Sequence, residues 1–240
     1  MSTTSPPRRP RPTVSELTAE VRHVIADLPR FATAPLYRSW HQRWGAMDAE
    51  VEAPMPGDDV ITDVAYESTR AITIYAPPDE VWPWLVQAGC LRAGFYANDL
   101  LDNLAHPSAW AILPEYQHLE VGQWVPMSPT PSDVTAFKVA GFEKHRWLLW
   151  QQPLSTWSWR LSPLPRGGTR LVTRLRIHLD WNQKATSFFS VILNEFGDFP
   201  MMRRMLLGIR DRAEAAHAAT AGTAIAADAA NTETVGPDAA

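Results

Sequence analysis

Residues 68–90, STRAITIYAPPDEVWPWLVQAGC, place a strand, a stop and a helix start in direct succession. The first half alternates polar and apolar side chains, which is the pattern of a half-buried β-strand. Pro77-Pro78 then ends the strand, because proline donates no hydrogen bond to a sheet ladder. The remainder predicts a short helix that carries Trp82 and Trp84 and leans on the sheet.

The Trp82-Pro83-Trp84 sequence constrains how this short helix packs. With Asp79 as the cap, Pro83 falls at the fourth helical position and removes one early hydrogen bond rather than breaking a long ladder. Trp82 and Trp84 are about 200° apart on a helix, so they face different neighbours. We expect one to plug the end of the sheet near its interior and the other to pack toward the N-terminal segment.

The clearest strand is residues 169–180, TRLVTRLRIHLD. Its leucines and Ile177 point to one face, and its arginines and His178 point to the other. Such alternation indicates an antiparallel sheet with one covered face and one wet face. Weaker strand patterns occupy residues 122–127, 134–142, 146–151 and 157–164.

The C-terminal part of the sequence predicts the helix that covers this sheet. Asp198 is a capping residue type, and Pro200 loses no intrahelical bond in a first turn. From there apolar residues recur at helical spacing, namely Phe199, Met202, Leu206, Ile209 and Ala213.

Changes in composition along the chain divide it into four parts. Residues 1–13 read as a disordered basic tail, and residues 14–66 as an N-terminal extension with a short amphipathic helix. Residues 67–217 hold the strands and the covering helix. Residues 218–240 are rich in alanine and read as a second disordered tail.

Composition excludes several functional classes. The chain of 240 residues has a net charge of −4, so it has no global bias toward nucleic acid. One cysteine, Cys90, excludes an intramolecular disulfide and fits a cytoplasmic location. No apolar stretch is long enough to span a bilayer, so we expect no stable membrane insertion. The seven histidines lack metal-ligand spacing and no nucleotide-binding motif occurs, so we expect neither a metal nor a cofactor.

The order of these elements, with particular residues in them, resembles the helix-grip fold of the START-like superfamily (SRPBCC). That superfamily includes plant pollen allergens, polyketide cyclases and lipid-transfer domains. The chain looks like an actinobacterial branch of it over roughly residues 40–216. The resemblance is carried by residues 69–74, 76–85, 92–96, 114–115, 121–122, 168–171 and 202–206.

The resemblance implies an α+β fold in which a curved antiparallel sheet wraps around a long C-terminal helix. Two short helices follow the first strand, and a hydrophobic cavity lies between sheet and helix. Superfamily members bind lipids, hormones or polyketides, act as cyclases, or assist other proteins. A shared fold does not settle which of these applies, so function has to be argued from the site.

A small hydrophobic or aromatic molecule, lipid-like or polyketide-like, is the partner that the inward-facing residues favour. Eleven tryptophans are a heavy load for a chain of this length, and most of them serve as core packing. The apolar positions of the strands and of the last helix suit the wall of a small-molecule pocket. The candidate ligand-binding residues are Trp157, Trp159, Leu161, Leu175, Ile177, Phe199, Met202 and Leu206.

Catalysis would need polar groups that point into the same apolar space, where burial tunes a carboxylate or phenol for proton transfer. The candidates are Tyr96, Asp99 and Glu115. Tyr96 and Asp99 are three residues apart and would face one side of a helical turn. Glu115 follows a proline in a loop that we expect at the cavity entrance. A capping, surface or hydrogen-bonding role is the competing interpretation of each.

Three hypotheses therefore stay open. The protein binds a small hydrophobic molecule, or it is an enzyme of the polyketide cyclase/aromatase type, or it is an interaction protein whose cavity is filled by its own side chains. A ligand-sized void with inward polar groups would favour the enzyme, and an apolar void would favour binding. The sequence is silent on the oligomeric state.

Overall fold

The computed structural model describes residues 37–179 and 198–233 continuously, and residues 13–15, 18, 21, 22, 25 and 26 before them. The strands are β1 (Tyr66–Ile74), β2 (Trp124–Pro126), β3 (Ala136–Glu143), β4 (Trp147–Gln152), β5 (Ser155–Pro163) and β6 (Thr169–Ile177). The helices are α2 (Arg38–Gln42), α3 (Asp48–Glu52), α4 (Pro78–Val86), α5 (Asp99–Asp102), the 3₁₀ helix η2 (Pro114–Tyr116) and α7 (Asp198–Glu233).

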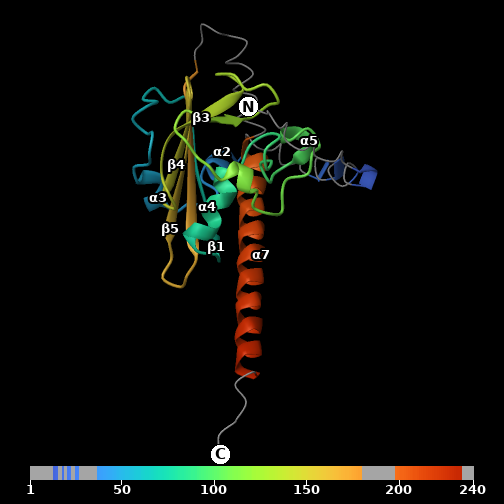
Figure 1. The fold of residues 1–240 in the computed structure, drawn as a ribbon. Helices are drawn as coiled ribbons and strands as arrows, with labels where there is room; N and C mark the ends of the chain where they lie inside the picture. Colours follow the sequence, from blue (N-terminus) through green and yellow to red (C-terminus); the bar gives the residue numbers. More distant parts are fainter. Residues whose placement is uncertain are drawn as a thin grey trace, which may run out of the picture.

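The described strands form an antiparallel sheet of six strands in the order β1-β6-β5-β4-β3-β2. The first strand therefore pairs with the last, from Tyr66 opposite Ile177 to Ile74 opposite Thr169. Helix α7 crosses one face of the curved sheet, with α4 beside it (Figure 1). The α+β helix-grip fold predicted from the sequence is confirmed.

The inner face of the sheet, which is turned toward α7, carries the core. Period-two alternation along β5 and β6 sends Trp159 and Leu171 inward, while α7 contributes Leu206 and Ile209 at helical spacing. All four side chains have no solvent-exposed surface. Sheet and helix are thus joined by one continuous apolar cluster.

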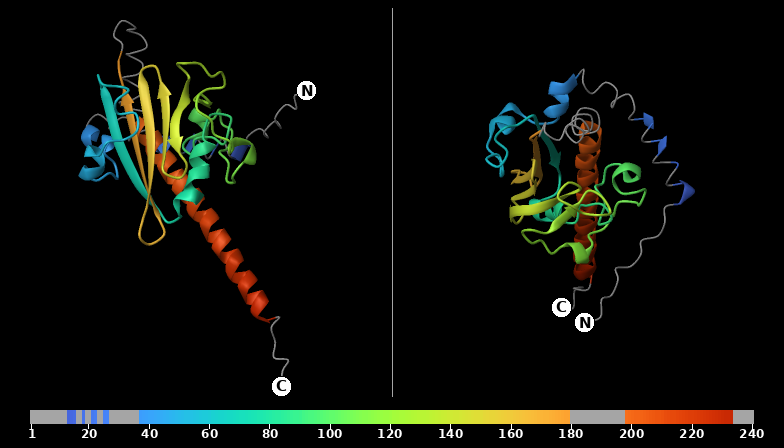
Figure 2. Two further views of the ribbon diagram at one scale, coloured as in Figure 1. Left: turned by 60° about the vertical axis from the view of Figure 1, so that its left-hand side comes forward. Right: turned by 90° about the horizontal axis from the view of Figure 1, so that it is seen from above.

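The outer face of the sheet was expected to be exposed to solvent, but part of it is covered. Helix α3 lies on the side of the sheet opposite α7 (Figure 2), and α2 packs beside β1 against Phe199 at the start of α7. The strands β1 and β6 are therefore covered on both faces. Arg174, on the face expected to meet solvent, is 4% exposed. Val172 on the same face packs against Met55 of the N-terminal extension.

The extension also covers the free edge of β1. The amide of Ala71 donates to the carbonyl oxygen of Trp44 over 3.1 Å, as an added strand would allow. Gly45 follows with φ of +73°, and a Cβ at this position would collide with the carbonyl oxygen of Ala71. Glycine is required here because the chain turns in the left-handed region while touching the strand.

Helix α4 begins earlier than the sequence suggested. Pro78 is its first residue and Asp79 makes no capping bond, so Pro83 is the sixth helical residue rather than the fourth. The two tryptophans face different neighbours, as expected, but neither reaches the extension. Trp82 lies against Phe142 and His145, and Trp84 lies against Tyr96. The extension's Trp40 and Trp44 instead pack on Phe199.

Helix α7 continues to Glu233, whereas a disordered tail was expected from residue 218. Alanine has the highest helix propensity of all residues, so an alanine-rich stretch extends a helix that packing has already started. The second half of α7 projects beyond the sheet (Figures 1 and 2). The predicted tail of residues 1–13 lies outside the described residues, apart from Thr13, and no described helix is long and apolar enough to cross a membrane.

Candidate functional site

Three tryptophans form a cluster on the inner face of the sheet. Trp150 of β4 is paired with Trp157 of β5, and Trp159 follows two residues later on the same face. The ring centroids are 5.1 Å apart for Trp150 and Trp157, 5.0 Å for Trp157 and Trp159, and 5.5 Å for Trp150 and Trp159. Edge-to-face and tilted contacts of this kind add to the stability gained from burial.

The cluster is apolar except for its indole N–H groups, and only one of these three groups has a hydrogen-bond acceptor among the described residues. Nε1 of Trp157 donates to Oγ1 of Thr173 over 2.9 Å. Nε1 of Trp150 and Nε1 of Trp159 are buried and have no hydrogen-bond partner among the described residues. A buried donor without an acceptor costs about 1–3 kcal/mol, so two such donors in one cluster need an explanation.

The sequence identified Trp157 and Trp159 but did not name Trp150. The signal was available in the alternation of β4, where Leu148 and Trp150 are both fully buried while Gln151 is not. Of the other predicted wall residues, four lie in the same core and Ile177 packs at its margin. The four are Leu161, Leu175, Met202 and Leu206.

Phe199 is the predicted wall residue that the structure places elsewhere. Its ring stacks on His41 of α2, with the centroids 4.0 Å apart and an interplanar angle of 14°. Trp40 and Trp44 contact the same ring from the extension. Phe199 therefore joins α7 to the N-terminal extension rather than facing the tryptophan cluster.

The space between sheet and α7 is filled by these side chains. Trp150, Trp159 and Leu206 are at most 1% exposed, so their side chains are packed on all sides by protein atoms. Two cavities lined by described residues, of about 330 and 270 Å³, lie on the outer side of the sheet instead. The first is bordered by Trp124 and Lys138, and the second by Trp147 and Arg160.

The two polar candidates near α5 are held by structural hydrogen bonds. The Tyr96 hydroxyl donates to the carbonyl oxygen of Trp84 over 2.9 Å. Asp99 accepts from the amide of Ser108 over 2.8 Å and from its hydroxyl. Tyr96 has φ of +59°, so the two residues do not share the helical turn that their spacing suggested. They meet through Ser108, whose hydroxyl also accepts from the Tyr96 amide.

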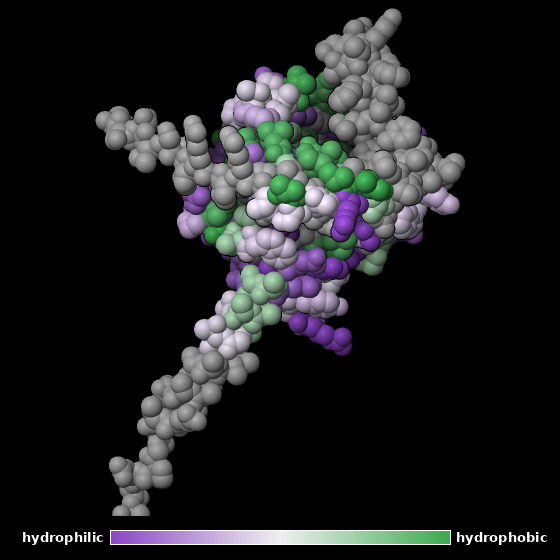
Figure 3. All heavy atoms as spheres, turned by 90° about the vertical axis from the view of Figure 1, so that its right-hand side faces the viewer, coloured by the Kyte–Doolittle hydropathy of each residue, from purple (hydrophilic) through white to green (hydrophobic). Residues whose placement is uncertain are grey.

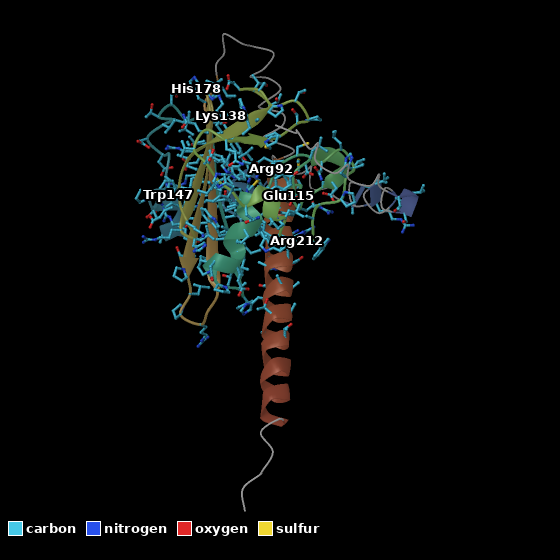
Figure 4. The ribbon with its side chains drawn as sticks, in the orientation of Figure 1. Arg92, Glu115, Lys138, Trp147, His178 and Arg212 are labelled. Carbon is cyan, nitrogen blue, oxygen red and sulfur yellow. The ribbon has the colours of Figure 1, made fainter. Side chains whose placement is uncertain are left out.

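Glu115 is exposed on η2 and belongs to neither group (Figure 4). Its carboxylate is not within hydrogen-bond distance of Tyr96 or Asp99. The structure thus brings Tyr96 and Asp99 to one loop, away from the indole cluster, and leaves Glu115 apart from both. Among the residues that the structure describes, no group of three or more histidine, cysteine or acidic side chains could hold a metal ion.

A buried ionic group anchors the start of α7 at the end of this core. Arg70 of β1 forms an ion pair of 2.6 Å with Asp198, and the Tyr66 hydroxyl donates to the same carboxylate over 2.7 Å. Burial and the neighbouring Asp198 raise the pKa of Tyr66 above its ordinary range, so the phenol stays protonated. Arg70 is thus an ion-pairing residue that joins β1 to the start of α7.

Comparisons with known proteins give structural likeness without close relatives. No family model and no curated protein matches the chain. Similar solved structures include a polyketide cyclase-like protein, Cgl2372 of Corynebacterium glutamicum, with 15% identity, 60% of this chain and 88% of that chain covered, and a TM-score of 0.38. The Zhui aromatase/cyclase of Streptomyces sp. R1128 has 14% identity, coverages of 62% and 93%, and a TM-score of 0.34. At these scores the likeness carries no argument about a ligand or an activity.

Proposed function

We propose that this protein binds a small, mostly apolar molecule between the inner face of the sheet and α7, against Trp150, Trp157 and Trp159. The observation that carries this proposal is the pair of buried indole N–H groups of Trp150 and Trp159, which have no acceptor among the described residues. Apolar packing alone would not need indoles at both positions, because a phenylalanine buries an aromatic ring without a donor.

The unpaired donors define the chemistry of the ligand. An indole N–H is satisfied by an oxygen acceptor at about 2.9 Å, such as a ketone, ester or carboxyl oxygen. The rest of the pocket wall is apolar, formed by residues such as Leu175 and Leu206. A carbonyl-bearing aromatic or lipid-like molecule matches both requirements.

Entry of such a molecule requires the core to open. The tryptophans and Leu206 have almost no exposed surface, so the described state is closed. A ligand that binds only the open state has its apparent affinity reduced by the fraction of molecules that are open. Binding is therefore expected to be slow and to raise the free energy of unfolding.

Binding without catalysis agrees best with the polar groups. Tyr96 and Asp99 are engaged with backbone and Ser108, and Glu115 is exposed. Neither hydroxyl nor carboxylate is directed at the indole cluster, where proton transfer to a bound substrate would take place. The polyketide cyclase/aromatase alternative therefore has less support from the geometry than a binding role.

A matched pair of probes tests the proposal. 1-Tetralone and tetralin have the same bicyclic skeleton, but 1-tetralone carries a carbonyl acceptor. We expect 1-tetralone to shift the indole Nε1–H resonance of Trp150 or Trp159 downfield in ¹H–¹⁵N spectra, assigned with Trp→Phe variants. Tetralin should bind about tenfold more weakly, which is the value of one buried hydrogen bond. The Trp157 resonance is the internal control, because its N–H already bonds Thr173.

Failure of both probes to perturb these resonances would leave the second candidate, an interaction protein with a filled interior. The observation that favours this candidate is the complete burial of Trp159 and Leu206. Mass spectrometry of molecules that co-purify with the native protein separates the two. A recurrent aromatic or lipid-like molecule supports binding, and its absence across several preparations supports the filled core.

A further inference from the structure

Four arginines of β1 and β6 are paired with carboxylates. Arg70 pairs with Asp198, Arg170 with Glu50 over 2.7 Å, and Arg174 with Asp58 over 2.6 Å. Arg176 pairs with Glu67 over 2.9 Å. This is the usual condition for an arginine removed from water, because an uncompensated buried charge is costly.

Arg212 of α7 breaks this pattern. It is 8% exposed, yet no carboxylate of a described residue lies within ion-pair distance of its guanidinium. Nε donates to the carbonyl oxygen of Ala109 over 2.8 Å, and Nη1 donates to that of Gly208 over 3.1 Å. Nη2 has no hydrogen bond to a described residue and, unlike the indole nitrogen of Trp159, is not sealed from solvent.

Two aromatic rings hold the guanidinium in place. Its Cζ lies 4.1 Å from the centroid of the Trp110 ring and 4.8 Å from that of the Tyr96 ring. Trp110 is 68% exposed although it is a large apolar side chain. The two backbone bonds and two rings fix the orientation of the guanidinium, so its open edge needs no further ordering when it meets a ligand.

We propose that Arg212, with Trp110 and Tyr96, is a binding site for a carboxylate or phosphate group at the surface beside α7. The planar guanidinium presents free N–H donors, which is the arrangement that recognises such anions. A bound anion would also supply the countercharge that Arg212 lacks. Because Arg212 lies outside the indole cluster, this site is separate from the proposed pocket.

Two carboxylates near Arg212 affect its charge. Asp99 and Asp211 lie near enough to favour the charged form of Arg212, but Asp99 is bonded to Ser108 and Asp211 to Arg210. Desolvation acts in the other direction and lowers the pKa of Arg212, which starts so high that the group stays charged.

The ligand is expected to combine the anion with an apolar body. Apolar side chains gather on the face of the molecule to the right of α7 in Figure 1, which Figure 3 shows directly. The exposed residues Leu101, Leu104 and Trp110 belong to the segment that covers Arg212. A short fatty acid and the headgroup region of an anionic lipid share this chemistry.

Arg92 has a similar lack of a carboxylate but carries no such site. Its Nη2 donates to the carbonyl oxygens of Val86 over 3.0 Å and Tyr116 over 3.5 Å, and its Nη1 to that of Trp124 over 3.5 Å. Its donors therefore serve the end of α4 and the loops around it. Figure 4 shows Arg92 and Arg212 at separate places along the molecule.

Titration of the full chain with hexanoate, hexanol and inorganic phosphate at low ionic strength tests the site. The readout is the Arg212 Nε–H resonance in ¹H–¹⁵N spectra, assigned with Arg212→Met. We expect hexanoate and phosphate to shift it and hexanol to leave it unchanged. Arg212→Met should weaken binding at least about tenfold, as loss of charge-assisted hydrogen bonds does. Arg210→Met, on the same helix and paired with Asp211, is the matched control and should bind as the wild type does.

Vesicles separate the two sources of the anion. Binding of free hexanoate or phosphate supports a soluble ligand. Binding to phosphatidylglycerol-containing vesicles but not to pure phosphatidylcholine, lost in Arg212→Met, supports a lipid headgroup. The proposed site is overturned if none of these probes shifts the Arg212 resonance. It is also overturned if Arg210→Met and Arg212→Met weaken binding of the probes equally. Where Arg212→Met fails to fold, Arg212→Lys assigns the resonance, because lysine has no Nε, and the wild-type titration decides the matter.

Discussion

Arg70 is the residue at which three parts of the molecule meet. Its guanidinium pairs with Asp198 at the start of α7, donates to the carbonyl oxygen of His41 in α2 over 2.7 Å, and reaches the Tyr66 hydroxyl at 3.3 Å. It is 1% exposed. The strand, the covering helix and the extension therefore share one buried charge, and each of them supplies part of its hydrogen bonding or its countercharge.

Replacing Arg70 by methionine should lower the free energy of unfolding by about 3–5 kcal/mol, because it leaves the Asp198 carboxylate buried without its cation. Urea denaturation followed by tryptophan fluorescence measures the change. Arg146→Met is the control, since Arg146 and Glu143 form an exposed pair over 2.6 Å whose loss should cost less than about 1 kcal/mol. Equal losses in the two variants would contradict the role assigned to Arg70.

At the scale of elements, α7 is one helix in two environments. Its first half is buried against the sheet and the loop around Tyr96, and the described side chains from residue 218 to 223 are exposed. Both Gly208 and Gly222 belong to α7, and Gly208 lies in the buried part while Gly222 lies in the exposed part. A Cβ at Gly208 would collide with the carbonyl oxygen of Tyr96 and lie 2.8 Å from its Cβ, whereas a Cβ at Gly222 would meet nothing within 4 Å.

Gly208→Ala and Gly222→Ala should therefore have opposite effects. The first forces the backbone of Tyr96 away from α7 and should destabilise by about 1–3 kcal/mol, despite the better helix propensity of alanine. The second should raise the helical signal in far-ultraviolet circular dichroism without loss of stability, because alanine favours a helix by about 1 kcal/mol over glycine. Thermal unfolding of both variants gives the comparison. A Gly208→Ala protein as stable as the wild type would mean that α7 does not touch this loop.

The docking of α3 on the sheet should depend on pH. Burial pushes the pKa of Glu50 up, but its hydrogen bonds from Arg170 and Met47 and the charge of Arg170 outweigh burial and hold it below the ordinary value. A carboxylate whose pKa is depressed in the folded state stabilises that state above the ordinary glutamate pKa, and this contribution is lost as pH falls through the depressed value.

We therefore expect the wild type to lose more stability than Glu50→Gln when pH is lowered through the acidic range below the ordinary glutamate pKa. Glu50→Gln should be less stable at neutral pH, and the two should converge in acid. Urea midpoints at a series of pH values measure this. Parallel curves for the two proteins would show that Glu50 makes no such contribution. Glu143→Gln, on the exposed pair with Arg146, is the matched control.

The elements themselves could be predicted from local patterns, but their outer neighbours could not. Alternation in β6 indicated the strand and its inner face, and the stripe from Met202 to Leu206 indicated the covering helix. The arginines of β6 show the same alternation in sequence whether the face that carries them is exposed to water or covered by the N-terminal extension. Their partners, such as Asp58 for Arg174, lie 116 residues away, and no local pattern reports such a distance.

The candidate site was predicted less completely than the fold. Inward-facing Trp157 and Trp159 follow from period two, but whether the space beside them is empty depends on the summed volumes of every core side chain. The positive φ of Tyr96 placed it off the helical turn that spacing alone suggested. Phe199 lies on the predicted stripe, and only the unpredicted position of α2 explains why it faces His41.

The whole molecule has three layers, with α7 inside the curve of the sheet and α3 outside it (Figures 1 and 2). The last described side-chain bonds between α7 and the rest of the protein are those of Glu214 with the Tyr75 amide, over 2.8 Å, and His217 with Glu80, also over 2.8 Å. Beyond them α7 extends past the layers. Stability should therefore depend on the first part of the helix alone.

Removing residues 224–240 should leave the melting temperature unchanged within about 2 °C, since no described packing is lost. Removing residues 211–240 should lower it by much more, because Arg212, Ala213, Glu214 and His217 go with the segment. Differential scanning calorimetry of the two truncated chains measures the difference. A large drop on removal of residues 224–240 would show that the projecting part of α7 packs on the protein.

The pairing of β1 with β6 has a consequence for how the chain is made. During synthesis β1 emerges about a hundred residues before its partner strand, and the Arg70 anchor waits longer still for Asp198. Contacts so distant in sequence slow folding, since the entropy of closing the loop is lost before the contacts form. The early-made extension, with its exposed Trp40, and the apolar face of β1 are therefore the parts of the nascent chain most in need of protection from aggregation.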